Sequence, residues 1–145
     1  MNLDHYQHLA LRTDMSRELP PAARILYHTA KLVEEVHEVL DAARHGKWAH
    51  VREERGDVMW HIVCLADARG LTASEAIVDV IPTQDPVRFV LQYLSSVAKE
   101  LGQGKAPKMS TEGALSALWH WAVGDESWAV LGAENIRKLE GRYGR

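Results

Sequence analysis

The sequence predicts an all-α protein, because apolar residues recur every three or four positions over long segments while strand signals are scarce. Runs of β-branched residues are short, and the chain has no Asn-Gly or Asp-Gly dipeptide of the kind that closes tight hairpins. Its 145 residues, of which 46% are hydrophobic, suffice for one compact domain spanning 1–145.

The first three helices are expected over 3–12, about 20–44 and about 48–68. Pro20 and Pro21 suit the first turn of the second helix, where a missing N–H costs no hydrogen bond. Gly46 ends that helix, and the short loop at 45–47 makes the second and third helices antiparallel neighbours. Gly70 ends the third.

The remaining elements follow from turn and cap signals. Thr72 with Glu75 has capping-box spacing and predicts a helix over 72–81, which Pro82 and Pro86 separate from one over 87–101. After the loop 102–107, Ser110 or Thr111 should cap a helix to Gly124, and a last helix covers 127–142. A weak echo of 58–61 in 117–120 suggests a degenerate internal duplication, whose second half packs on the first as a structural copy.

Charge and composition narrow the functional classes. The 17 basic and 20 acidic residues are intermixed without a basic block, so no nucleic-acid partner is expected. The first residues lack the apolar core of a signal peptide, and no run approaches transmembrane length, so we expect a cytoplasmic protein without a membrane partner. The single cysteine, Cys64, falls in an apolar stretch and is expected to be a buried thiol.

Two pairs of carboxylates border the faces that the second and third helices must bury. Glu35 and Glu38 are three residues apart on the second helix, and Glu54 and Asp57 repeat that spacing on the third. Antiparallel packing lets the pairs face each other, and four such carboxylates would repel one another strongly without a cation. Hard oxygen ligands suit Mg²⁺, with Mn²⁺ as a substitute. The alternative is that both pairs are ordinary solvated helix surface.

These motifs resemble a known family. The segments 31–38 (KLVEEVHE) and 54–60 (ERGDVMW) are similar to the Glu-Glu-x-x-Glu and Glu-x-Gly-Asp signature of MazG-like nucleoside triphosphate pyrophosphohydrolases, an all-α superfamily that includes dimeric dUTPases. Segments 6–13, 70–72 and 135–143 resemble the family's lead-in, its Gly-Leu-Ser/Thr turn and its closing motif. The resemblance implies a MazG-like helical bundle and Mg²⁺-dependent hydrolysis of nucleoside triphosphates to the monophosphate and pyrophosphate, a clean-up of the nucleotide pool.

The resemblance also implies residue roles. Glu35, Glu38, Glu54 and Asp57 would ligate Mg²⁺, and Glu34 would orient or deprotonate the attacking water. The expected substrate-binding residues are cations for the phosphates, aromatic groups for the base and one amide: Lys31, Lys138, Arg142, Trp60, His61 and Asn135. For each of them surface charge or core packing is the competing interpretation, and Trp119, Trp121 and Trp128 are expected to be packing residues.

One segment departs from the family pattern. The resemblance covers about 3–77 and 130–143, with catalytic helices at about 20–69, and leaves extra helices over about 78–130. The extra helices put in doubt whether Asn135, Lys138 and Arg142 reach the metal site. Family members usually complete the site from two subunits, so we expect a homodimer, although these helices are candidates to replace the second subunit.

The sequence leaves other functions to be considered. A di-iron bundle needs a second Glu-x-x-His motif besides residues 34–37, and the sequence has none. A dUTP-restricted pyrophosphatase cannot be separated from a general one, because base selectivity depends on the shape and hydrogen bonds of a pocket. A non-catalytic nucleotide-binding or interaction module is the remaining alternative.

Overall fold

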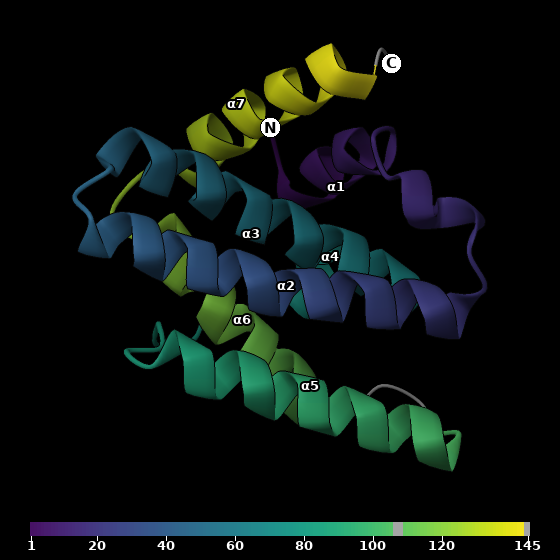
Figure 1. Cartoon of the computed structure of the whole chain (residues 1–145). Helices are drawn as coiled ribbons and strands as arrows, with labels where there is room; N and C mark the ends of the chain where they lie inside the picture. Colours follow the sequence, from purple (N-terminus) through teal and green to yellow (C-terminus); the bar gives the residue numbers. More distant parts are fainter. Residues whose placement is uncertain (106–108, 144–145) are drawn as a thin grey trace.

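The computed structural model describes residues 1–105 and 109–143, which form helices and connecting loops and contain no strand. The described residues form seven α-helices and one 3-10 turn. Figure 1 shows the other helices arranged around the long α2–α3 hairpin. The all-α prediction is confirmed. The elements in chain order are α1 (Leu3–Leu11), η1 (Met15–Glu18), α2 (Pro21–Arg44), α3 (Trp48–Ala68), α4 (Ala73–Ala76), α5 (Pro86–Gln103), α6 (Met109–Val123) and α7 (Trp128–Tyr143).

Two elements differ from the sequence prediction. The 3-10 turn η1 was not predicted; it forms because the Asp14 carboxylate accepts the backbone N–H of Ser16 and caps the turn. Helix α4 starts with the expected Thr72–Glu75 capping box but ends at Ala76 instead of residue 81. Its continuation is replaced by tertiary bonds, since Ser116 on α6 donates to the Ala76 carbonyl and accepts from the N–H of Val78.

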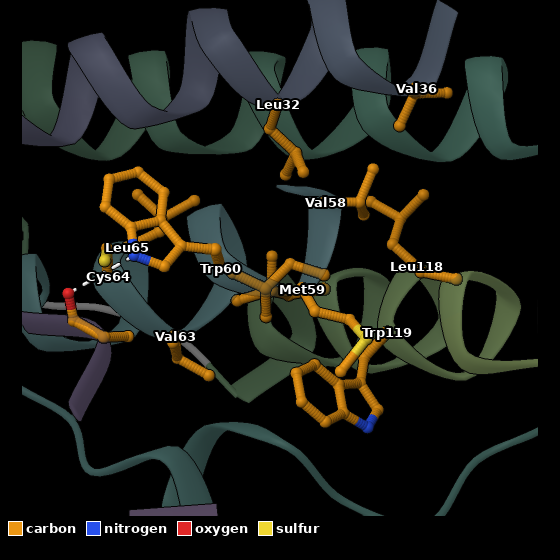
Figure 2. Close-up of a cluster of buried hydrophobic side chains, with 14 of the residues drawn as sticks. Leu32, Val36, Val58, Met59, Trp60, Val63, Cys64, Leu65, Leu118 and Trp119 are labelled. Atoms are coloured by element: carbon orange, nitrogen blue, oxygen red, sulfur yellow. Dashed lines mark hydrogen bonds between the residues drawn. The ribbon is translucent and has the colours of Figure 1, made fainter. Parts of the chain in front are cut away.

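The α2–α3 hairpin forms the centre of the molecule. The predicted packing residues Leu32 and Val36 on α2 are fully buried, as are Val58 and Ile62 on α3. In Figure 2, Leu32 and Val36 point from α2 towards α3, while Leu118 lies on the α6 side of the same cluster. One continuous apolar core therefore fixes how α2 and α3 face each other, and with them the carboxylates at their edges.

The extra helices pack along this hairpin. Helix α5 contacts α2, and α6 contacts both α5 and α3. Figure 1 shows α5 and α6 on one flank of the central hairpin, with α1 and α7 on the other. A second helical pair, α5 and α6, therefore packs along the first pair. Trp119 is buried and packs near the rings of Tyr6 and Trp128, as a packing residue should.

A buried ion cluster fastens the extra helices to the end of α3. The guanidinium of Arg69 lies 2.9 Å from Glu100 on α5 and 2.7 Å from Glu112 on α6, and all three side chains are almost fully buried. Thr111 donates a hydrogen bond to Glu100 at 2.8 Å. Burying charges is costly unless they are paired, so this cluster specifies one position for the α5–α6 pair.

Candidate metal and nucleotide site

Three of the four predicted metal ligands converge between α2 and α3. Carboxylate oxygens of Glu35, Glu38 and Glu54 all lie within 4.8 Å of one another. Glu35 and Glu54 are 8% and 6% exposed, and Glu38 is half-buried at the groove edge. The i, i+3 spacing on each helix and the short 45–47 loop produce this convergence, as the sequence predicted.

The electrostatics of the cluster fit a cation. Burial raises the pKa of Glu35 to about 10, and the nearby Glu54, Asp57 and Glu38 carboxyls add to the shift. Burial also raises the pKa of Glu54. Each of these two residues has a buried Oε2 atom without a hydrogen-bond partner among the described residues. Unpaired buried oxygens in a cluster of like charges are the donor set that a hard divalent ion satisfies.

Asp57, the fourth predicted ligand, is held by α7. Its Oδ1 accepts hydrogen bonds from Nδ2 of Asn135 at 2.8 Å and from Nζ of Lys138 at 2.6 Å. Lys138 also lies 3.4 Å from Glu53. Asn135 and Lys138 therefore reach the carboxylate site despite the helices that intervene in the sequence. Gly56 permits the close approach, because a Cβ there would lie 3.2 Å from the Cβ of Asn135.

A cavity of about 210 Å³ opens beside these carboxylates. Glu35 and Asp57 line it together with the predicted substrate-binding residues Lys31, Trp60, His61 and Arg142. The rest of its lining, which the sequence did not indicate, comes from the segment around η1 and from α2 and α7: Thr13, Met15, Tyr27 and Leu139. The cavity thus brings acidic, basic and aromatic groups to one place, as a nucleotide site requires.

The aromatic and cationic groups differ in how they can act. The indole N–H of Trp60 donates to Ala10 and Thr13 within the core, so this residue can offer its ring face rather than its N–H. The ammonium of Lys31 lies 3.0 Å from Glu34. Arg142 is largely exposed, and one of its guanidinium nitrogens lies 4.0 Å from a carboxylate oxygen of Glu53. Its guanidinium is therefore held less closely than the ammonium groups of Lys31 and Lys138.

Glu34 lies on a different side of α2 from this cavity. Its carboxylate is exposed and paired with Lys31, and it lines a shallow groove with Glu38 and Val87. Glu38 belongs both to this groove and to the carboxylate cluster. The structure places Glu34 beside the carboxylate cluster but not among the residues that line the cavity.

A buried network behind the cavity was not predicted. The Asp14 carboxylate accepts from Arg24 at 2.7 Å and lies 3.0 Å from Nε2 of His28, whose Nδ1 lies 3.0 Å from Nδ1 of His61. His28 lies three residues before Lys31 and seven before Glu35, which places all three on one side of α2, and this spacing is the only sequence feature that points to His28. No sequence feature points to Asp14, because the fold of the chain around η1 brings it to the site. Cys64 is a buried free thiol, as expected.

Comparison with known proteins agrees with this geometry. The family model described as the MazG nucleotide pyrophosphohydrolase domain matches residues 25–89, which include both carboxylate pairs. The search of curated proteins gave no match, and neither did the search of solved structures. None of the helices in the described ranges is long and apolar enough to cross a membrane. The resemblance seen in the sequence motifs is thereby confirmed for residues 25–89, which are similar to the MazG nucleotide pyrophosphohydrolase domain.

Proposed function

We propose that the protein hydrolyses nucleoside and deoxynucleoside triphosphates to the monophosphate and pyrophosphate in a Mg²⁺-dependent reaction. The observation that carries the proposal is the convergence of Glu35, Glu38 and Glu54 beside a cavity that also holds basic and aromatic side chains. The match to the MazG domain supports nucleotide pyrophosphohydrolase chemistry, and this cavity supports a triphosphate as the substrate.

The proposed metal ligands are Glu35, Glu38, Glu54 and Asp57. Their hard oxygens favour Mg²⁺, and Mn²⁺ is the expected substitute. When bound, the metal neutralises the charge that develops on the phosphate oxygens. Asn135 and Lys138 hold the Oδ1 atom of Asp57 by hydrogen bonds.

The basic residues around the cavity fit the phosphate chain. A triphosphate carries more negative charge than one divalent ion neutralises, so additional cations are needed. Lys138 lies at Asp57, and Lys31 and Arg142 line the cavity beside it. We assign Lys138 and Arg142 to the phosphates, with Lys31 as a third candidate.

Glu34 is our candidate for orienting the attacking water. It follows from the family resemblance, and its exposed carboxylate beside Glu38 leaves it accessible to solvent water. A Glu34→Gln variant should lower kcat and retain metal binding. Metal binding and turnover lost together would assign Glu34 to the metal site instead.

The decisive experiment is a panel of ribo- and deoxyribonucleoside triphosphates with Mg²⁺, in which pyrophosphate and orthophosphate are measured separately. Wild type is compared with Glu38→Gln and with Asp41→Asn, which removes an exposed carboxylate three residues further along α2. Pyrophosphate release that disappears only in Glu38→Gln supports the proposal. Tight nucleotide binding without turnover by wild type would favour the non-catalytic alternative, and turnover of dUTP alone would favour the dUTP-restricted one.

The oligomeric state, the cellular location and the partners of the protein are part of the proposal. We propose a homodimer that acts on a nucleotide in the cytoplasm and does not bind nucleic acid. The α5–α6 pair already covers one flank of the hairpin, so sedimentation of the purified chain at several concentrations tests whether a second copy is still needed.

A further inference from the structure

The α2 wall of the cavity carries a row of three side chains at successive i, i+4 positions: Tyr27, Lys31 and Glu35. Four residues of helix rise about 6 Å, so the row covers about 12 Å along the axis of α2. Glu35 lies at one end and belongs to the carboxylate cluster. Lys31 lies in the middle of the row, and Tyr27 marks the other end.

The α3 wall of the cavity has the same order. Asp57 lines it beside the carboxylates, and Trp60 and His61 follow along the helix. Because α2 and α3 are antiparallel, His61 comes next to Tyr27, with the two ring centroids 6.5 Å apart. The cavity therefore has a carboxylate end and an aromatic end. A nucleotide has a matching order, with phosphates at one end, the sugar in the middle and the base at the other end.

The aromatic side chains of the cavity differ in how much surface they can offer to a base. Trp60 is 8% exposed and His61 5%, so almost all of their ring surface is already covered by protein. Tyr27 is 43% exposed. A ligand gains free energy by removing exposed ring surface from water, and Tyr27 is the aromatic residue that still has such surface.

The orientation of the rings leads to the same residue. The ring planes of Tyr27 and His61 meet at 62°, so one flat base cannot be parallel to both. A base that stacks on the exposed ring of Tyr27 would therefore meet His61 at its edge. Stacking is then the role of Tyr27, and His61 forms part of the buried wall.

We infer that Tyr27 is a base-binding residue, whose ring stacks on the nucleobase while the metal ligands and the basic residues hold the phosphates. This inference rests on the proposed function and assigns the base end of its substrate. Every base has a π-face, so stacking favours nucleotides over triphosphates without a base and does not select a single base. Purines cover more of the tyrosine ring than pyrimidines and should depend on it more.

The test is equilibrium binding, which needs no turnover. Isothermal titration calorimetry with Mg²⁺ compares the nonhydrolysable α,β-imido analogues of ATP, UTP and ribose 5-triphosphate, the last of which has no base. Tyr27→Leu removes the ring and should weaken binding of the ATP analogue roughly 10- to 100-fold, and of the UTP analogue less. Binding of the ribose analogue should change by no more than about twofold, because it has nothing to stack.

Two control variants separate stacking from other effects. Tyr27→Phe keeps the ring and should bind all three ligands as wild type does; a loss in this variant would overturn stacking in favour of a contact to the hydroxyl. Leu26→Ala changes the preceding residue of α2, which is 47% exposed and lies outside the lining of the cavity, and should leave the three affinities unchanged. Equal losses for all three ligands in Tyr27→Leu would overturn the base contact.

The outcomes also separate this inference from the proposed function. Wild type that binds the ribose analogue as tightly as the ATP analogue would overturn the base contact and leave the triphosphate site in place. Base-dependent binding that is lost in Tyr27→Leu, in a protein that releases no pyrophosphate from nucleoside triphosphates, would support the base contact and overturn the hydrolytic proposal. Wild type that binds none of the three ligands would overturn both.

Discussion

The ammonium of Lys138 lies 2.6 Å from Oδ1 of Asp57, which joins α7 to α3 across 81 residues of sequence. Both side chains are about one-fifth exposed, so water screens this pair only partly. The same carboxylate is a proposed metal ligand. Lys138 therefore fixes the orientation of a proposed metal ligand, and it lies at the place where we propose that the phosphates bind.

Replacing Lys138 with methionine should lower kcat/KM for a nucleoside triphosphate by roughly 10- to 100-fold, because charge-assisted contacts to phosphate are lost. Steady-state pyrophosphate release measures this. Arg137→Met removes a neighbouring exposed charge on α7 and should change kcat/KM less than twofold. Equal losses in the two variants would indicate a general charge effect instead of a specific contact.

Magnesium should stabilise the wild-type fold. An ion that binds only the folded state at about 100 times its Kd adds roughly 2.7 kcal/mol, which corresponds to a rise of roughly 5–10 °C in Tm. Thermal unfolding with EDTA and with Mg²⁺ gives the difference. Glu54→Gln should abolish it, and without metal this variant should be at least as stable as wild type because one repelling carboxyl is gone.

The matched control is Asp41→Asn, which should keep the magnesium effect since Asp41 is exposed on α2. A magnesium-induced rise that persists in Glu54→Gln would place the ion elsewhere.

Gly56→Ala should destabilise the protein by about 1–3 kcal/mol, although alanine is the better helix former. The added methyl would lie 3.2 Å from both Cβ and Nδ2 of Asn135, which separates α3 from α7 and disturbs the bond to Asp57. Gly113→Ala on α6 meets no atom within 4 Å and should be neutral or stabilising by up to about 1 kcal/mol. Urea unfolding compares the two, and equal effects would contradict the proposed close approach.

Acid should lower the free energy of unfolding, because it protonates the carboxylate of Asp14. Hydrogen bonds from His28, Ser16 and Arg24 overcome burial and hold the pKa of Asp14 below its ordinary value of 3.8. The folded carboxyl binds its proton less tightly than the unfolded one, so the stabilisation is complete well above pH 3.8 and is lost as the pH falls below it. The free energy of unfolding, measured between pH 2.5 and 7, should decrease accordingly.

Asp14→Ala should lose about 3–5 kcal/mol at neutral pH, because Arg24 and His28 are left without their buried partner, and its acid dependence should be smaller than that of wild type. Asp67→Asn is the control, since Asp67 pairs with the same Arg24 but is 35% exposed, and its cost should stay below about 1 kcal/mol. A neutral Asp14→Ala variant would show that the network does not stabilise the fold.

The sequence predicted the parts of this structure that depend on local periodicity. The stripe from Ile25 to Val39 on α2 and the i, i+3 carboxylate spacings are helical regularities, and the loop at 45–47 fixes the antiparallel pairing. The family motifs added Asn135 and Lys138, which local spacing alone does not connect to Asp57.

The features of the structure that the sequence did not predict depend on contacts between distant segments. The Asp14–His28–His61 network joins three elements, and none of its spacings has a helical or strand period. The early end of α4 follows from Ser116, 40 residues away, competing for the Ala76 carbonyl. Such tertiary bonds override local propensity, and a single sequence carries no direct signal for them.

The α5–α6 pair is tethered to the hairpin that it covers. Its docking is an intramolecular equilibrium with a fixed effective concentration, set by the connecting segment and not by how much protein is present. A flank supplied by a separate subunit would dissociate on dilution, whereas this one cannot. The surroundings of α2 on that side should therefore remain intact at the nanomolar enzyme concentrations used in kinetic assays.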